Sequence, residues 1–225
     1  MVDPKIAPSG QIKLTPEIIL RAYSAGIFPM AKDRHNNQLF WVDPEQRGII
    51  PLNGLRISRS LKKQVRKSKY NIRYNSDFMG IIMGCAKQTE NRNETWINDE
   101  IISLYTQLFE QGFVQTVECW QDEELVGGLY GVSLKGAFFG ESMFSNKSNA
   151  SKIALVHLVA RLNEDGFILL DTQFTTNHLI SLGAIEIPRS DYLVQLDKAL
   201  LIEANFNSNG AEILHRAYVE KLLYN

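Results

Sequence analysis

The chain has 225 residues, of which 44% are hydrophobic and 22% charged, and this is ordinary for a globular protein with one large domain or two unequal ones. No apolar run approaches the ~20 residues that span a bilayer, and the N-terminus lacks the apolar stretch of a secretory signal, so we expect neither a membrane nor a secreted protein. The two cysteines have no CxxC spacing and the four histidines no HxxxH pattern, which predicts a reduced, cytoplasmic protein without a metal site.

Positive charge is concentrated in one short segment. Between Arg56 and Arg73 there are eight basic residues and no acidic residue, whereas the formal net charge of the whole chain is −1. Most charge runs are only the solvated face of a helix, but such a face usually mixes both signs. The absence of acids therefore favours contact with a polyanion.

The first part of the chain is rich in loops. Thr15-Pro16 predicts the start of a short helix that ends before Gly26. The other expected elements are two strands flanking a turn, and then the basic helix, at residues 48–51, 55–58 and 58–69. A change to mixed apolar sequence near residue 70 predicts a small N-terminal domain, 1–70, and a larger domain, 71–225.

The second part alternates more regularly. The expected helices lie at residues 76–86, 99–111, 150–163 and 178–182. The expected strands are a meander and two later strands, at residues 114–120, 124–134, 137–144, 167–173 and 192–196. One or two helices follow in the tail. This order predicts an α+β fold, and it resembles the GNAT acyltransferase fold, in which strands splay to admit two substrates.

Two carboxylates stand out because each ends an apolar strand. Glu141 follows a glycine-punctuated hairpin, and Asp171 ends the apolar run 167–170. Gln173 lies two residues beyond Asp171 and therefore on the same face of the strand. A carboxylate in this position is a candidate for acid–base chemistry. The structural alternatives are a capping or salt-bridged Asp171 and an ordinary surface charge at Glu141.

Eight segments, in order along the chain, resemble the leucyl/phenylalanyl-tRNA–protein transferase family. They are residues 20–30, 57–61, 95–97, 126–132, 138–145, 149–152, 170–173 and 178–188. The resemblance implies a cytoplasmic enzyme that needs no cofactor. It would move leucine or phenylalanine from aminoacyl-tRNA to the N-terminal amine of proteins that begin with arginine or lysine, and so mark them for N-end-rule degradation.

Such a reaction is the aminolysis of an activated ester, so the enzyme mainly aligns two reactants and handles one proton. We expect Asp171 to hold the amine and to accept its proton as the C–N bond forms. Gln173 would orient that carboxylate or the reacting carbonyl. Glu141 would hold the cationic residue of the acceptor or complete a hydrogen-bond relay with Gln173.

The resemblance also implies binding sites for the donor. An apolar pocket would select the amino acid with Leu129, Met143, Leu158, Leu162 and Leu170, although each residue alone is typical of a hydrophobic core. Such a pocket discriminates by only ~1–3 kcal/mol per methylene, so methionine can also enter.

The resemblance implies two kinds of contact with the tRNA. Trp96 and Trp41 could stack on the terminal adenine, and ordinary burial is the alternative for each. The phosphates would contact the basic segment through Arg59, Lys62, Lys63, Arg66 and Lys67. Segment 40–46, Gln115 and the tail beyond Ala199 depart from the family pattern.

Two other functions remain open. An acetyl-CoA-dependent N-acetyltransferase would share the fold, but its pyrophosphate loop is usually glycine-rich, and residues 145–150 contain no glycine. A non-catalytic tRNA-binding module would need the basic segment alone, and the presence of both Asp171 and Gln173 argues against it. Nothing in the sequence indicates an obligate interface, so we expect a monomer.

Overall fold

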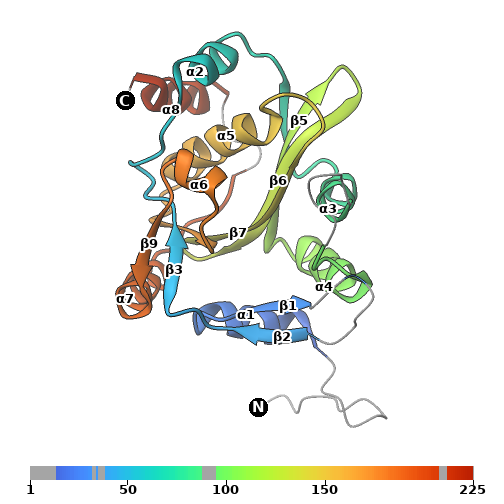
Figure 1. Ribbon diagram of the computed structural model, residues 1–225, viewed down its shortest axis with the longest axis vertical. Coiled ribbons are helices and arrows are strands. Elements are labelled where there is room, and N and C mark those ends of the chain that lie inside the picture. Colours follow the sequence, from blue (N-terminus) through green and yellow to red (C-terminus); the bar gives the residue numbers. More distant parts are fainter. Residues whose placement is uncertain (1–13, 32–33, 35–38, 88–94, 208–211, 225) are drawn as a thin grey trace.

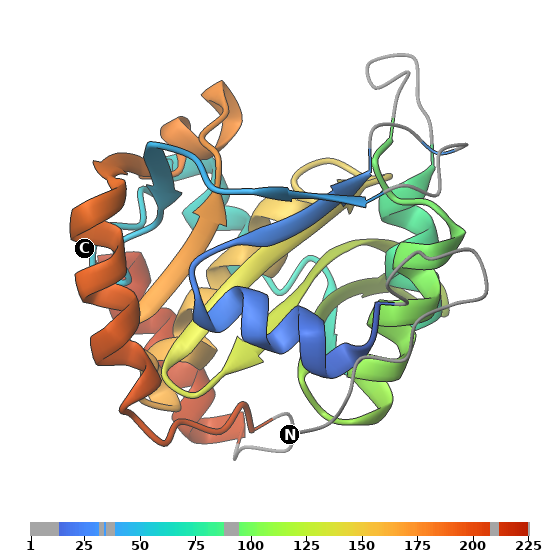
Figure 2. The ribbon, with the colours of Figure 1, turned by 90° about the horizontal axis from the view of Figure 1, so that it is seen from below.

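A seven-stranded mixed sheet with helices on both faces forms the centre of the molecule (Figures 1 and 2). The computed structural model describes residues 14–31, 34, 39–87, 95–207 and 212–224. The helices are α1 (Pro16–Ser24), α2 (Arg59–Arg66), α3 (Phe78–Ala86), α4 (Asp99–Glu110), α5 (Ala150–Glu164), α6 (Asn177–Ser181), α7 (Arg189–Leu200) and α8 (Glu212–Tyr224). The strands are β1 (Phe28–Ala31), β2 (Leu39–Val42), β3 (Gln46–Ile49), β4 (Asn71–Tyr74), β5 (Val114–Gln121), β6 (Glu124–Leu134), β7 (Ala137–Ser145), β8 (Leu169–Gln173) and β9 (Ile185–Pro188).

The large sheet has the order β4-β5-β6-β7-β8-β3-β9, and β1 and β2 form a separate antiparallel ribbon. All neighbours in the large sheet are antiparallel except β7 and β8, which run parallel. Parallel neighbours require a crossover, and α5 supplies it. Short turns join the antiparallel meander, and Lys135 adopts the positive φ of 56° that the turn between β6 and β7 demands.

The two parallel strands separate partway along their length. Their pairing covers only Ala137 to Phe139 of β7, opposite Leu169 to Asp171 of β8. Beyond this point β7 continues to Ser145 while paired only with β6. The sheet therefore divides between β7 and β8 immediately after the Phe139–Asp171 pair, and the next residues on the same face of each strand are Glu141 and Gln173.

Two hydrophobic cores lie on opposite faces of the sheet. One contains α5, which is buried on most of its surface, with the inward sides of α2 and α8. In α2, Leu61 and Val65 are buried four residues apart, so the cations of this helix face outward. The other core contains α1, α3, α4 and α7. None of the described helices is long and apolar enough to cross a membrane.

The predicted α+β fold is confirmed, with its meander, its long apolar helix and the strand after that helix. Two predicted strands are wrong. Residues 55–58 form no strand, and residues 192–196 belong to α7, where Tyr192, Leu196 and Ala199 are buried at helical spacing. The strand of this region, β9, comes earlier. The short strands β1, β2 and β4 were not expected.

Candidate active site

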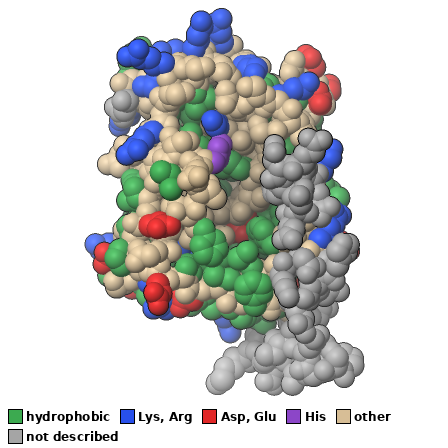
Figure 3. Space-filling model, in the orientation of Figure 1, with side chains coloured by type: hydrophobic (Ala, Val, Ile, Leu, Met, Phe, Trp, Pro, Cys, Tyr) green, Lys and Arg blue, Asp and Glu red, His purple; other side chains and the backbone are tan. Residues whose placement is uncertain are grey.

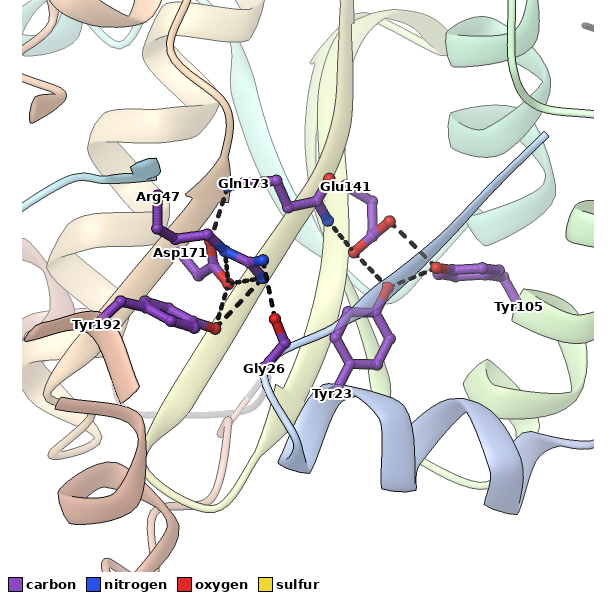
Figure 4. A network of polar contacts seen from close by, with 8 residues as sticks. All are labelled: Tyr23, Gly26, Arg47, Tyr105, Glu141, Asp171, Gln173 and Tyr192. Carbon is purple, nitrogen blue, oxygen red and sulfur yellow. Dashed lines mark hydrogen bonds and ion pairs between the residues drawn. The ribbon is translucent and has the colours of Figure 1, made fainter. Parts of the chain in front are cut away.

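Asp171 lies at the centre of a buried network that connects β3, β8 and α7 (Figure 4). Arg47 donates to it from Nε at 3.0 Å and from Nη2 at 2.7 Å. The hydroxyl group of Tyr192 donates at 2.7 Å. Asp171 has no exposed surface and Arg47 is 1% exposed, so the pair is fully desolvated. Such a pair is stable only when its remaining donors and acceptors are satisfied, and here they are.

Hydrogen bonds and two aromatic rings fix the position of the Arg47 guanidinium group. Its Nη1 donates to the carbonyl oxygen of Gly26 at 3.0 Å, and its guanidinium plane lies between the rings of Phe28 and Tyr192, at 4.6 and 4.5 Å from their centroids. Burial alone would lower the pKa of Arg47, but the Asp171 carboxylate outweighs burial and raises it. The guanidinium therefore stays charged and fixes the orientation of Asp171.

The Asp171 carboxylate in turn fixes Gln173. Its Oδ1 accepts the backbone N–H of Gln173 at 2.7 Å, a local bond that favours turn geometry. Gln173 has φ of 64°, in the left-handed region that residues with a Cβ rarely adopt. Strain of this kind persists only where the surroundings impose it, and it is common at functional sites. The side chain of Gln173 is thereby directed to Glu141, and its Nε2 donates to Oε1 at 2.8 Å.

Glu141 receives further hydrogen bonds from two tyrosines in the core that also contains Tyr192. Tyr23 of α1 donates at 2.6 Å and Tyr105 of α4 at 3.1 Å, and the two hydroxyl oxygens are 2.5 Å apart. Burial raises the pKa of Glu141 to about 7, although the two tyrosine hydrogen bonds act in the opposite direction. A carboxyl group with this pKa exchanges protons near neutral pH, which suits acid–base work.

The expectation that Asp171, Gln173 and Glu141 lie together agrees with this geometry. That Asp171 itself takes the proton stays a prediction. Its side chain is fully buried and accepts hydrogen bonds from Arg47, Tyr192 and the backbone of Gln173. Glu141 also accepts three hydrogen bonds, but it is only half-buried, at the point where β7 and β8 separate. Figure 3 shows that this face of the molecule is hollowed near its centre, with hydrophobic side chains gathered below the hollow.

Removing one tyrosine hydroxyl group should move the pKa of Glu141. The Tyr23 hydrogen bond stabilises the carboxylate form and lowers this pKa, so Tyr23→Phe is expected to raise it further above about 7. Carboxyl ¹³C NMR of Glu141 across pH 5–9 measures the change. Tyr218→Phe, a half-buried tyrosine on α8, serves as the control. A lower pKa in Tyr23→Phe would contradict this description of the network.

The structure places the expected pocket residues in the core on the α5 side. Leu129, Leu158, Leu162 and Leu170 are each at most 3% exposed, and Met143 packs against them half-buried. The hydrogen-bond partners of Glu141, Tyr23 and Tyr105, belong to the core on the other face of the sheet. Selection of the donor by these residues stays a prediction.

The expected tRNA contacts lie on two surfaces. Trp41 is 42% exposed on β2, whereas Trp96 is half-buried against the core that contains α4. Of the five basic residues predicted to hold phosphates, Lys62 is half-buried and the others are exposed: Arg59, Lys63, Arg66 and Lys67. Lys and Arg side chains gather over the end of the molecule where α2 and α8 lie (Figures 1 and 3).

Four residues of the network were missed in the sequence. Tyr23 lies inside a segment that carried the family resemblance, but nothing in its local pattern distinguishes it from a core tyrosine. Tyr192 was predicted to lie in a strand. Arg47 and Tyr105 are 124 and 36 residues from their carboxylate partners. Only the arrangement of the sheet brings these residues together.

Comparison with known proteins supports the resemblance. A family model described as leucyl/phenylalanyl-tRNA protein transferase matches residues 49–197, and the model of that family's N-terminal domain matches residues 13–45. The leucyl/phenylalanyl-tRNA–protein transferase of Rhodospirillum rubrum is 51% identical over 203 residues, which cover 90% of this chain and 95% of the relative. The protein of the same name from Maricaulis maris is 53% identical over 197 residues, covering 88% and 91%.

These matches put the chain among the aminoacyltransferases, and both carboxylates of its network, Glu141 and Asp171, lie within the matched residues 49–197. More narrowly, the chain belongs to the leucyl/phenylalanyl-tRNA–protein transferase family. The family predicted from the eight sequence segments is confirmed.

Proposed function

We propose that this enzyme transfers leucine, phenylalanine or methionine from aminoacyl-tRNA to the N-terminal amine of proteins that begin with arginine or lysine. The observation that carries the proposal is the Gln173–Glu141 hydrogen bond of 2.8 Å at the point where β7 and β8 separate. An ester and an amine can meet there beside a carboxyl group whose pKa is about 7. The names of the relatives agree with donors of this kind.

The reaction forms one bond and breaks another. The amine nitrogen attacks the ester carbonyl carbon, the C–N bond forms, and the C–O bond to the terminal ribose breaks. Glu141 takes the proton that the amine nitrogen loses and passes it to the departing ribose oxygen, so the carboxylate is restored. Gln173 orients the reactants, while Asp171 and Arg47 hold Gln173 in its strained conformation. Most of the rate acceleration would then come from alignment.

Several finer features belong to the same proposal. The separation of β7 from β8 supports a GNAT-like fold, because strands diverge in that fold to admit substrates. We also propose that the protein acts as a monomer in the cytoplasm, where aminoacyl-tRNA and acceptor proteins are both present. A division of the chain near residue 70 also stays a proposal, and the position of β3 between β8 and β9 favours an earlier division, near residue 45.

A reconstituted transfer assay tests the proposal. The purified chain would receive labelled Leu-, Phe- or Met-tRNA together with peptides that begin with Arg, Lys, Asp or Ala. We expect labelled product from the Arg and Lys peptides alone. Acetylation of the same peptides from acetyl-CoA without tRNA would contradict the proposal and favour the N-acetyltransferase. Binding of tRNA without any product would favour the non-catalytic module.

Replacing one exposed cation of α2 should weaken tRNA binding in a salt-dependent way. Lys63 lies on the outward face of α2, and each phosphate contact contributes about one counterion to the salt dependence. In Lys63→Gln, the slope of log Kd against log salt is expected to fall by about one. Filter binding at several salt concentrations measures it, and Lys198→Gln on α7 is the control. An unchanged slope in Lys63→Gln would exclude a contact between Lys63 and tRNA.

A further inference from the structure

The C-terminal helix α8 encloses a second site, away from the network around Asp171. It packs against α5 through Val219, Leu222 and Leu223, which belong to the same core as α5 and α2. Figure 1 shows α8 beside α2 at one end of the molecule. The match to the main family model ends at residue 197, so α8 lies beyond it. This arrangement leaves a cavity of about 620 Å³ between α2, β4, α5 and α8, a size typical of ligand sites.

The charge of this cavity favours an anion. Among its described lining residues, the cations Arg66, Lys69, Arg161 and Arg216 face a single acid, Glu220. That acid is 3.9 Å from Arg66 and both are well exposed, so the ion pair is weak. Lys and Arg side chains gather over the end of the molecule where α2 and α8, two of the elements that line the cavity, lie (Figures 1 and 3). Arg161 is paired with Glu164 and Asp165, which lie outside the lining, so the excess positive charge that an anion meets comes mainly from Lys69 and Arg216.

Arg161 supplies fixed donors on the inner wall. It is 2% exposed, yet its Nε and Nη1 make no hydrogen bond. Its Nη1 is 2.9 Å from Glu164 Oε2, an ion pair without hydrogen-bond alignment. Buried donors are almost always satisfied, and a guanidinium group matches the oxygens of a phosphate group in geometry and charge. Among the described residues, Nε has neither a hydrogen bond nor an ion pair, and a buried donor of this kind beside a cavity points to a ligand.

The remaining polar residues of the inner wall are neutral hydrogen-bonding groups. His215 Nε2 is 2.8 Å from the Tyr74 hydroxyl oxygen and 3.1 Å from His157 Nδ1. Burial lowers the pKa of His157 to about 3 and that of His215 to about 4, with nearby positive charge acting in the same direction. At neutral pH these rings add no charge. Both nitrogens of His215 already have partners, because its Nδ1 is 3.3 Å from Glu164 Oε2, so this ring forms part of the wall and leaves the anion to the cations.

From these observations we infer that the cavity between α5 and α8 binds a phosphate group, with Arg161 at its inner wall and Lys69 and Arg216 at its mouth. The cavity is larger than one phosphate group, so the group belongs to a larger ligand. Two sources share this chemistry: a nucleotide of the bound tRNA, or a free phosphorylated small molecule. Only the first source rests on the proposed function.

Titration calorimetry of the full chain with pyrophosphate, at constant ionic strength against sodium chloride, tests the inference. We expect saturable binding. Arg161→Lys keeps the charge but loses the planar fork of donors, so it should weaken binding by about tenfold or more, the size of effect expected for a charge-assisted hydrogen bond. Arg216→Gln, an exposed change that leaves the core intact, should also weaken it. Lys221→Gln, an exposed cation of α8 outside the cavity, is the matched control and should bind as the unaltered protein does.

Two results would overturn the inference: no saturable binding, or equal binding by the unaltered protein, Arg161→Lys and Arg216→Gln. A second experiment identifies the source. If the phosphate belongs to tRNA, pyrophosphate competes with tRNA, and Arg216→Gln weakens tRNA binding. If the ligand is free, pyrophosphate binds the tRNA complex with an unchanged Kd. The first titration contains neither tRNA nor acceptor, so it does not depend on the transfer reaction. If the chain binds pyrophosphate but transfers no amino acid, this inference stands and the proposed function is wrong.

Discussion

Glu141→Gln is expected to lower the single-turnover rate of transfer by about 10²–10⁴-fold, the usual contribution of a general base. Glutamine keeps the size, and its side-chain oxygen can accept from Tyr23 and Gln173. Its amide NH2 group replaces the oxygen that faces Tyr105 and can donate to that hydroxyl oxygen, so the network should persist. The loss would then report the missing proton acceptor. The measurement is rapid-quench transfer with saturating donor and acceptor. A loss below threefold would remove Glu141 from proton transfer.

The pH dependence of the same two proteins gives a sharper comparison. Because burial raises the pKa of Glu141 to about 7, the carboxylate form is lost as the pH falls through that value. The acceptor amine, with a pKa of about 7.7–8.0, also titrates, but it does so in both proteins. The rate ratio of wild type to Glu141→Gln should therefore fall below pH about 7 and be constant well above it. A ratio independent of pH would contradict the assignment.

Glu141→Gln should also be more stable than wild type at pH 8. Between pH 4.5, the ordinary pKa of the group, and pH about 7, the folded protein binds more protons at Glu141 than the unfolded protein does. The stabilisation that this group gives the wild type is therefore complete below pH 4.5 and is lost as the pH rises through about 7. Glutamine does not ionise, so the variant should gain roughly 1–3 kcal/mol over this window. Urea unfolding at pH 4.5 and pH 8 measures the difference.

Arg47→Met is expected to lower the free energy of unfolding by about 3–5 kcal/mol, because it leaves the buried Asp171 carboxylate without its counter-charge. Methionine has a similar length and can still pack between Phe28 and Tyr192. Urea denaturation with tryptophan fluorescence measures the loss. Transfer activity should fall as well, since Asp171 no longer holds Gln173.

The double variant Arg47→Met/Asp171→Asn separates charge from shape. Asparagine is neutral and can still accept the N–H of Gln173 through its side-chain oxygen, so at least half of the lost stability should return. Activity should stay low, because the amide lacks the fixed orientation that Arg47 imposes. A single Arg47→Met variant that loses less than about 1 kcal/mol would contradict the buried-pair argument.

The sequence was a good guide wherever periodicity is strong. The meander, α5 and β8 follow from apolar patterns and glycine positions, and the spacing of Asp171 and Gln173 placed both on one face. Arg47 illustrates what a local pattern does not contain. It lies in a short strand that pairs with two strands more than 120 residues away in sequence, so its partner emerges only from sheet topology.

The wrong strand at residues 192–196 has a physical cause. These residues are apolar except for Gln195, and so short an apolar stretch fits a strand as well as a helix. The longer pattern indicates a helix, because the buried residues Tyr192, Leu196 and Ala199 repeat at helical spacing. The carboxylates were assigned from strand ends alone. Burial, which separates the enclosed Asp171 from the half-buried Glu141, depends on neighbours that the local sequence does not specify.

The most direct test of the central claim is a crystal structure with two ligands: an adenosine that carries phenylalanine through a stable amide, and a peptide with N-terminal arginine. The account predicts the amide carbonyl carbon within hydrogen-bonding range of Gln173 and the peptide amine beside Glu141, between β7 and β8. A structure in which both ligands bind elsewhere, with the Gln173–Glu141 bond unchanged and enclosed, would contradict it.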